Sequence, residues 1–156
     1  MGYLIDGVLG LDEDGQTRMV RTPWFDHDIP FEQAAEIGTR KVIREHSTIG
    51  VVVLTDGSIT DIPRSAYLEA EERVIGELKA LEKPFVVLLN STHPQQADTR
   101  RLRESLEKQY GVPVMAVDVL NMREEDINAL LESVLFEFPL TEVRISGVHE
   151  LRLGQE

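Results

Sequence analysis

Three short polar segments each follow an apolar, strand-like run of this chain. They are Thr55-Asp56-Gly57-Ser58, Asn90-Ser91-Thr92-His93, and the pair Asp118 and Asn121. The carboxyl ends of parallel strands meet at one edge of a sheet, and open α/β sheets bind ligands there. These carboxylate, amide and hydroxyl groups can therefore converge on one small ligand. The same residue types also form ordinary strand-to-helix turns and helix caps, so the pattern by itself selects no reaction.

Several kinds of catalytic and binding site are not supported by the sequence. It contains neither Gly-x-x-x-x-Gly-Lys-Ser/Thr nor Gly-x-Gly-x-x-Gly, so the usual phosphate-binding loops are missing. No serine lies in a Gly-x-Ser-x-Gly turn, which argues against a nucleophilic hydrolase. There is no cysteine, and the four histidines lack the spacing of metal ligands. We therefore predict no metal site.

The composition predicts one soluble, cytoplasmic domain. At 156 residues the chain is long enough to bury a hydrophobic core. Its net charge of −12 argues against nucleic acid as a partner, because binding to phosphates requires clustered Lys and Arg. No apolar run approaches the ~20 residues of a membrane-spanning helix, so we expect no transmembrane segment. The first residues do not have the pattern of a secretory signal peptide.

Residues 1–30 differ from the rest of the chain. Two short β-type runs, YLIDGVLGL and QTRMVRTPWF, flank the tight-turn pattern Asp12-Glu13-Asp14-Gly15. We therefore predict a β-hairpin. The acidic turn lacks the Gly and Glu spacing of a calcium loop, so we interpret it as a plain turn.

A helix followed by three strand–helix repeats is predicted for residues 31–138. Apolar residues at helical spacing mark the first helix, from Phe31 to about Glu45. Solid apolar runs are typical of strands that are buried in a parallel sheet. Such runs occupy residues 49–54, 85–89 and 114–117.

Short signals predict where the later helices begin and end. Pro63 is expected in the first turn of the second helix, and Asp98 as the cap of the third. Asn121, with Glu124 three residues later, is expected to open the fourth helix. Gly111 is expected just past the end of the third helix.

The order of these elements predicts the fold class. Strands that alternate with helices form parallel βαβ units with right-handed crossovers. We expect a three-layer α/β domain with a mostly parallel sheet over residues 1–145. Within it, residues 1–30 would be a hairpin extension and residues 31–138 the helix and the three units. Residues 146–156 would be a polar tail.

Several stretches of the sequence closely resemble one protein family. They are RMVRTPWFDHDIPFEQAAEIGTRKVIREHSTIGVVV, TDGSI, EAEERVI, LEKPFVVLLNS, MREEDI and LFEFP. From about Gly2 to about Val143, the chain resembles stage IV sporulation protein A of endospore-forming bacteria. The resemblance implies a P-loop GTPase-like domain of a spore-coat morphogenetic ATPase. It also implies ATP and Mg²⁺ as cofactors, polymerisation on the forespore surface in the mother-cell cytoplasm, and spore-coat proteins as partners.

The resemblance also gives the second polar segment a role. In the GTPase fold, an Asn-Lys-x-Asp motif at a strand tip recognises guanine, and the matching positions here are Asn90, Ser91, Thr92 and His93. An imidazole cannot replace the Asp carboxylate that accepts two guanine protons, so we expect guanine specificity to be lost. Asp118 lies in the next base-side loop. By resemblance, Asn90, Ser91, His93 and Asp118 bind the base side of a nucleotide.

The resemblance further predicts what these residues lack. In the family, the phosphate loop and the Asp-x-x-Gly motif precede the positions that match Gly2 and Tyr3. We expect a partial nucleotide domain that does not hydrolyse ATP alone, since positioning and neutralising the phosphoryl group is most of such catalysis. An exposed strand edge and apolar surface are then expected, and self-association would cover them. Two alternatives stay open: a non-catalytic scaffold, and a small-ligand-binding α/β module that uses the three polar segments.

Overall fold

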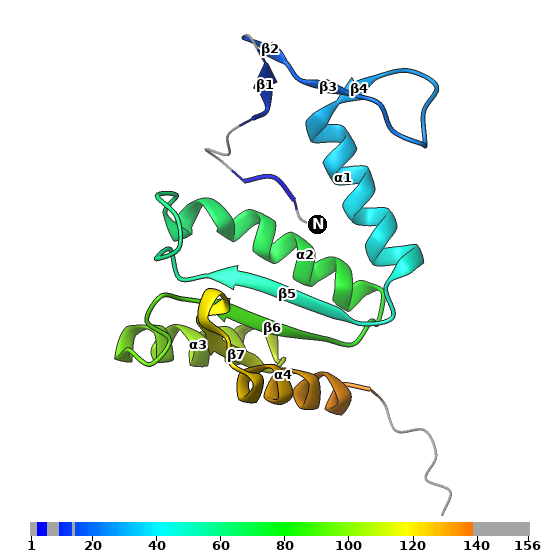
Figure 1. Ribbon diagram of the computed structural model, residues 1–156. Coiled ribbons are helices and arrows are strands. Elements are labelled where there is room, and N and C mark those ends of the chain that lie inside the picture. Colours follow the sequence, from blue (N-terminus) through cyan, green and yellow to red (C-terminus); the bar gives the residue numbers. More distant parts are fainter. Residues whose placement is uncertain (1–2, 6–9, 14, 139–156) are drawn as a thin grey trace, which may run out of the picture.

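A parallel sheet of three strands lies at the centre of the computed structural model, which describes residues 3–5, 10–13 and 15–138 (Figure 1). The sheet has the order β5-β6-β7. In its register Val52 lies opposite Val87. The strands are β5 (Gly50–Thr55), β6 (Phe85–Asn90) and β7 (Val114–Val117).

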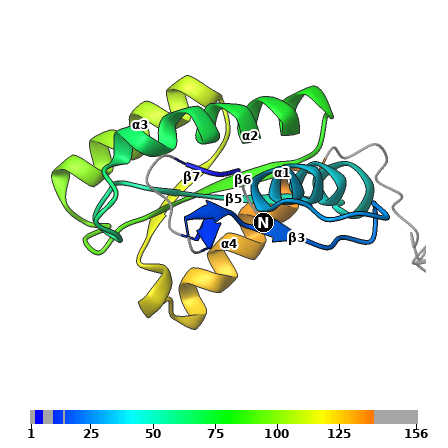
Figure 2. The same cartoon turned by 90° about the horizontal axis from the view of Figure 1, so that it is seen from above.

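The described residues also form four α-helices. α2 and α3 lie on one face of the sheet, and α4 lies on the other (Figure 2). α1 leads into β5 through a π-helical turn, η1 (Val42–His46). A helix connects each strand of the sheet to the next, as parallel pairing requires. The α/β class with a parallel sheet is therefore confirmed. The helices are α1 (Phe31–Lys41), α2 (Leu68–Ala80), α3 (Ala97–Tyr110) and α4 (Glu124–Phe136).

The core lies between the sheet and the pair α2 and α3. The apolar run of β6, from Phe85 to Leu89, is entirely buried, so this central strand is covered on both faces. α2 contributes Ile75 and Leu78 to the same cluster, and α3 contributes Leu106. Each of these side chains is less than 5% exposed, and full burial of such a side chain stabilises the fold by about 1.5–3 kcal/mol.

Two small antiparallel strand pairs lie among the described N-terminal residues. β1 (Asp12–Glu13) pairs with β2 (Gln16–Thr17) across the predicted turn. Gly15 in this turn has φ of 76°, a conformation that glycine adopts without strain. β3 (Met19–Val20) pairs with β4 (Ile29–Pro30), directly before α1.

Tyr3 connects the first described residues to α1 and α2. The guanidinium of Arg73, on α2, stacks 4.0 Å from the centroid of the Tyr3 ring. Arg73 also lies 2.7 Å from Glu36 on α1, and the Tyr3 hydroxyl donates a hydrogen bond to Glu77. Burial, followed by the hydrogen bond and the charge of Glu77, raises the pKa of Tyr3 to about 12. We call these four residues the Tyr3 clamp.

The predicted caps of α3 and α4 were wrong. Gln96 is the N-cap of α3, and Asp98 lies in its first turn, where it pairs with Arg101. A carboxylate in that turn is still favourable, because it faces the positive end of the helix dipole. α4 begins at Glu124, three residues after the predicted start at Asn121, because Asn121 itself belongs to a separate 3-10 turn, Val119–Asn121.

The other helix boundaries lie close to their predicted places. Pro63 precedes a short 3-10 turn, η2 (Arg64–Tyr67), and α2 follows directly. α3 ends where predicted, with Gly111 in the left-handed conformation at φ of 64°. The predicted strand-like run and polar tail, residues 141–156, lie outside the described residues. Within the described ranges, no helix combines the length and apolar character needed to cross a bilayer.

Candidate functional site

The three predicted polar segments meet at one edge of the sheet. The backbone N–H of Asp56 donates to the carbonyl of Asn90 at 3.3 Å. The N–H of Ser91 donates to the carbonyl of Val117 at 2.9 Å. These hydrogen bonds extend the ladders of the parallel strands past their ends, so the segments form one surface. We call it the strand-tip edge; it comprises residues 55–58, 90–93 and 118–121.

Three of the four predicted base-side residues, Asn90, Ser91 and Asp118, make hydrogen bonds inside the protein. Ser91 is completely buried. Its hydroxyl accepts a hydrogen bond from the N–H of His93 at 3.0 Å and lies 3.5 Å from the hydroxyl of Thr99 on α3. The side-chain oxygen of Asn90 accepts from the N–H of Val119 at 3.0 Å. The side chains of Asn90 and Ser91 therefore fix the shape of the strand-tip edge.

Asp118 shapes the third segment. Its carboxylate accepts hydrogen bonds from the N–H groups of Leu120 and Asn121, at 3.1 and 3.3 Å, and from the carboxamide of Asn121 at 2.8 Å. An Asp in this position caps a short 3-10 turn, η3 (Val119–Asn121), as Asx residues commonly do. Asp118 and Asn121 thus lie together, as predicted. Their contact stabilises the 3-10 turn, and α4 begins only after it, at Glu124.

His93 is exposed, in contrast to the other three predicted residues. Its Nδ1 lies 2.8 Å from the hydroxyl of Thr92. The N–H of Thr92 donates to the hydroxyl of Ser58 at 3.0 Å, so the segment after β5 supports the loop that carries His93. A neutral imidazole offers one donor and one acceptor. Of the four side chains, His93 is therefore the one best placed to contact a ligand directly.

Asp56 is a charged residue of the strand-tip edge that was predicted as part of a polar segment but was not among the four base-side residues. Its carboxylate accepts hydrogen bonds from the N–H and hydroxyl of Ser58, at 2.9 and 2.6 Å, and from the hydroxyl of Thr99 at 3.3 Å. Burial raises the pKa of Asp56, but hydrogen bonds, led by that of the Ser58 hydroxyl, outweigh burial and lower it below its ordinary value.

A buried ion pair lies behind the tip of β5. Glu71 on α2 is 3% exposed, and its Oε2 lies 3.0 Å from Nη1 of Arg64. The same guanidinium donates to the carbonyl of Thr55 at 2.6 Å, and the Tyr110 hydroxyl donates to Glu71 at 2.9 Å. Burial, followed by this hydrogen bond, raises the pKa of Tyr110. No sequence pattern signals this network, because Arg64 and Glu71 meet across two different elements, η2 and α2, and Tyr110 lies 39 residues from Glu71.

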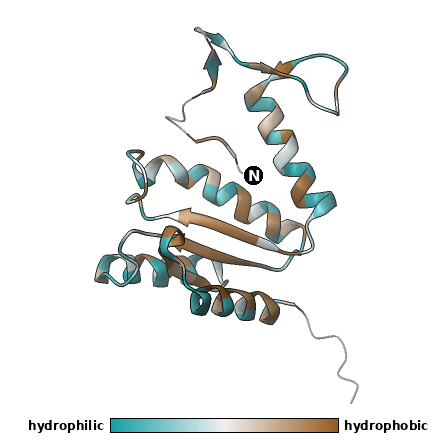
Figure 3. Cartoon of the chain, viewed as in Figure 1, coloured by the Kyte–Doolittle hydropathy of each residue, from teal (hydrophilic) through white to brown (hydrophobic). Residues whose placement is uncertain are grey.

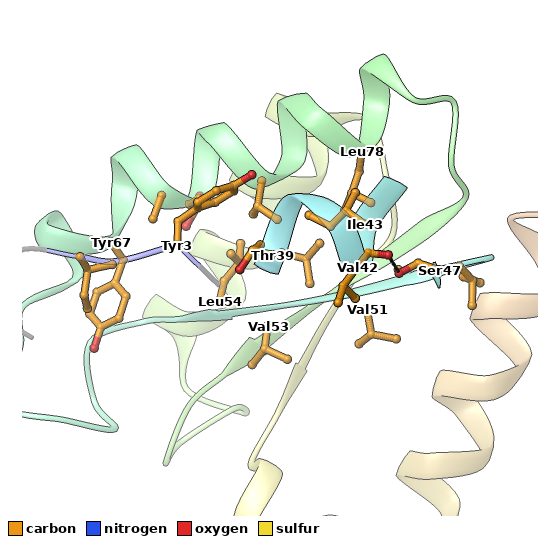
Figure 4. A pocket seen from close by; sticks show the side chains of 17 residues that line it. Tyr3, Thr39, Val42, Ile43, Ser47, Val51, Val53, Leu54, Tyr67 and Leu78 are labelled. Atoms are coloured by element: carbon orange, nitrogen blue, oxygen red, sulfur yellow. Dashed lines mark hydrogen bonds between the residues drawn. The ribbon is translucent and has the colours of Figure 1, made fainter. Parts of the chain in front are cut away.

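A cavity of about 510 Å³ lies along the outer side of β5, away from the strand-tip edge (Figure 4). None of the four predicted base-side residues lines it. We call it the edge groove; its lining includes Thr39, Val42, Val51, Val53, Val74 and Leu78. Among the residues that the structure describes, no group of three or more His, Asp or Glu side chains could hold a metal ion.

Comparison with known families assigns the chain. Residues 1–139, which contain the whole strand-tip edge, match the family described as stage IV sporulation protein A, ATPase domain. The chain belongs to this family. The resemblance expected from the sequence is therefore confirmed, and the protein is a relative of sporulation proteins that carry an ATPase domain.

Individual relatives agree with this assignment. Over 146 residues the chain is 56% identical to stage IV sporulation protein A of Clostridioides difficile (strain 630). It is 51% identical to the proteins of that name in Bacillus anthracis and Bacillus subtilis (strain 168). These alignments cover 94% of this chain, which spans about 30% of the length of each of these curated relatives. No solved structure matches the chain significantly.

Proposed function

We propose that this chain forms the base-side part of the nucleotide domain of a sporulation coat-assembly ATPase. The observation that supports this is the meeting of three polar strand tips at one edge of a parallel sheet, within the residues that match the ATPase domain. Open parallel sheets bind nucleotides at this edge. Under this proposal the fold is the carboxyl-terminal part of a P-loop GTPase-like domain.

The strand-tip residues divide into two roles under this proposal. Asn90, Ser91 and Asp118 position the loops around the base through their internal hydrogen bonds. His93 faces the base. Because a neutral imidazole cannot accept the paired N–H protons of guanine, His93 disfavours GTP and is compatible with ATP.

We further propose that these residues do not hydrolyse ATP by themselves. ATP and Mg²⁺ would be the cofactors of the longer family members. Catalysis of phosphoryl transfer depends on groups that hold the phosphates and the metal. The present sequence contains no phosphate-binding glycine pattern, and Asp56 places a negative charge at the strand-tip edge.

The proposed cellular role is assembly of the spore coat. Membership of the sporulation family supports a place at the forespore surface, on the cytoplasmic side of the mother cell, with coat proteins and other copies of the protein as partners. Exposed apolar side chains on β5 and α4 support self-association, because large apolar patches commonly mark protein interaction sites.

A nucleotide titration followed by NMR tests the proposed base-side site. Isotope-labelled protein is titrated with ATP and Mg²⁺ and, in parallel, with GTP. We expect the amide signals of residues 90–93 and 118–121 to shift with ATP at millimolar concentration. His93→Asp supplies a paired carboxylate acceptor, and a bidentate contact of this kind discriminates by about 1–3 kcal/mol. We therefore expect GTP to gain about tenfold in affinity relative to ATP.

His27→Asp is the matched control for this titration. His27 is exposed in the N-terminal part of the chain, so the same chemical change there should leave the ratio of ATP to GTP affinity unaltered. If neither nucleotide shifts the strand-tip amides at about 10 mM, a concentration at which even millimolar affinities saturate, the base-side proposal is wrong.

A non-catalytic scaffold is the second candidate. It is favoured because the polar side chains of Asn90, Ser91 and Asp118 form hydrogen bonds with other groups of the protein. The same titration separates the two functions, because a scaffold that has lost nucleotide binding shows no change at the strand-tip edge. The small-ligand-binding module has no comparable support, since the same internal bonds leave few polar groups there for a ligand.

A further inference from the structure

Asp56 lies between the first two segments of the strand-tip edge and α3. β5 and β6 are strongly apolar, and hydrophilic segments follow both strands at this edge (Figure 3). The hydroxyl of Ser58 donates to Oδ1 of Asp56 at 2.6 Å, and the hydroxyl of Thr99 donates to Oδ2 at 3.3 Å. Each carboxylate oxygen therefore ends a separate chain of hydrogen bonds, which we call the Oδ1 chain and the Oδ2 chain.

The Oδ1 chain reaches the backbone of Thr92. The N–H of Thr92 donates to the hydroxyl oxygen of Ser58 at 3.0 Å, and the same hydroxyl donates to Asp56. Thr92 and Ser58 are 34 residues apart in the sequence. This chain therefore joins the loop after β6 to the segment after β5, and its bonds extend beyond a local turn.

The Oδ2 chain reaches the backbone of His93 through the interior of the protein. The N–H of His93 donates to the hydroxyl oxygen of Ser91 at 3.0 Å, and the hydroxyls of Ser91 and Thr99 lie 3.5 Å apart. Ser91 is completely buried and Thr99 is 4% exposed. Because buried hydroxyls find their partners within the protein, bulk water does not compete for these contacts.

The chemistry of the two ends fixes the direction of donation in both chains. A backbone N–H can only donate, and an ionised carboxylate can only accept. Burial raises the pKa of Asp56, but hydrogen bonds, led by that of the Ser58 hydroxyl, lower it below its ordinary value, so Asp56 is ionised at neutral pH. The hydroxyl proton of Thr99 goes to Asp56, so that of Ser91 goes to Thr99 or to Asp56 itself. Both chains therefore run from a backbone N–H to Asp56.

We propose that Asp56 positions the backbone of Thr92 and His93, and so sets where the imidazole of His93 lies. Asp56 is then a positioning residue, which acts through other groups and not by touching the base. The consequence for the nucleotide rests on the proposed base-side function, in which His93 faces the base. Because Asp56 is ionised, the hydrogen bonds that end on it are charge-assisted and stronger than those between neutral groups.

A turn-forming role alone would not require these contacts. The bond from the N–H of Ser58 to Asp56, at 2.9 Å, is typical of the turns that Asp forms after a strand. Thr99, however, is 43 residues from Asp56 and lies on α3. The carbonyl of His93 also accepts from the N–H of Gln96 at 3.0 Å, at the start of α3. The loop that carries His93 is therefore held from both the β5 side and the α3 side.

Hydrogen exchange of two amides tests the positioning itself. Asp56→Asn keeps the size of the side chain but leaves one acceptor oxygen for two chains. We expect solvent exchange of the Thr92 and His93 amides, measured by NMR, to become about fivefold faster, the factor that corresponds to one lost hydrogen bond. Asp61→Asn removes the same charge from an exposed residue between β5 and η2 and should leave both rates unchanged. Unchanged rates in Asp56→Asn would overturn the proposal.

Two variants of Thr99 test the Oδ2 chain by itself and keep the proposal testable if Asp56→Asn does not fold. Thr99→Val removes the hydroxyl with little change in shape, and Thr99→Ser retains it. We expect Thr99→Val to speed exchange of the His93 amide and to leave that of Thr92 unchanged, because the Oδ1 chain does not include Thr99. Thr99→Ser should restore the original rates. If the two variants behave alike, the hydroxyl does not hold His93 and the Oδ2 chain is wrong.

A double-mutant cycle with His93 tests the consequence for the nucleotide. In the ATP titration we expect Asp56→Asn to weaken binding about fivefold, because one hydrogen bond that holds His93 in place is lost. In the His93→Ala background the same substitution should have almost no effect, since a positioning residue acts only through the group that it positions. An equal loss in both backgrounds would show that Asp56 acts independently of His93 and would overturn its positioning role.

The exchange and binding measurements separate this inference from the proposed function. If the original chain binds neither ATP nor GTP, the base-side function is wrong, and the exchange rates alone decide whether Asp56 positions the loop. If ATP shifts the strand-tip amides but Asp56→Asn leaves the Thr92 and His93 rates unchanged, the base-side function is supported and the positioning role of Asp56 is wrong.

Discussion

β5 and β6 have nearly the same apolar character but opposite environments. β6, FVVLLN, is buried along its apolar length, whereas β5, GVVVLT, alternates between buried and exposed side chains. The cause is position in the sheet. Among the described residues, β6 has a strand on each side and helices over both faces, whereas β5 has one neighbouring strand, and its Val51 and Val53 side chains are exposed. A solid apolar run thus predicts a strand, but it does not predict how many neighbours that strand has.

The largest test of this contrast places the same charge on both strands. Val87→Asp buries a carboxylate in β6 where no partner is available, so we expect a loss of at least about 4 kcal/mol and loss of cooperative folding. Val53→Asp puts that group on the exposed side of β5 and should cost less than about 1 kcal/mol. Urea unfolding followed by circular dichroism measures both. Similar losses would show that β5 is covered in solution.

A second test concerns the Arg64–Glu71 pair, because β5 is less buried than β6 and we expect side-chain contacts to contribute more to its stability. Glu71→Gln removes the charge that pairs with Arg64, which anchors the carbonyl of Thr55. We expect a loss of about 2 kcal/mol, below the usual cost of breaking a fully buried pair, because Arg64 is partly exposed. Glu69→Gln, on the exposed side of α2, should change the unfolding free energy by less than about 0.5 kcal/mol. An equal effect of the two variants would show that the network does not anchor β5.

The smallest test compares the residues at the tips of the two strands, Asp56 and Asn90. Because the pKa of Asp56 is lowered in the folded state, its charge contributes stability above the unfolded value of about 3.9, and this contribution is lost as the pH falls through the folded pKa. Asp56→Asn should therefore cost about 1 kcal/mol at pH 7. Asn90 does not titrate and adds no such dependence.

Urea unfolding at pH 7 and at pH values below about 4 checks this sign. The difference between the original chain and Asp56→Asn should shrink as the pH falls, because both then carry an uncharged group at position 56. A difference that stays constant over this range would mean that the carboxylate charge of Asp56 is not stabilised by the bonds from Ser58 and Thr99.

Local patterns were enough to predict the elements of the fold. The strands at β5, β6 and β7 and the end of α3 at Gly111 follow from apolar runs and glycine conformation, which depend on neighbouring residues alone. The starts of α3 and α4 were misplaced because the residues that precede them are not marked by a cap signal: Gln96, the N-cap of α3, makes no side-chain capping hydrogen bond. Asp118 caps η3 and keeps Asn121 out of α4.

The candidate site was predictable in position and less so in detail. Parallel topology brought the strand tips together, as the sequence indicated. The inward contact of Ser91 and one of the hydrogen bonds to Asp56 involve Thr99, which α3 supplies from elsewhere in the chain. The Arg64–Glu71 pair likewise joins residues whose contact only the folded chain defines. Contacts of this kind leave no local pattern in a single sequence.

The Tyr3 clamp makes one of the three tyrosines of the chain an optical reporter. With a pKa of about 12, Tyr3 keeps its proton through the range near pH 10 in which a free tyrosine ionises. Release of residues 3–5 from α2 would expose the ring and return its ionisation to that range. The difference in phenolate absorbance near pH 11 between the original chain and Tyr3→Phe would then report the fraction of molecules whose N-terminal segment is detached, without any added label.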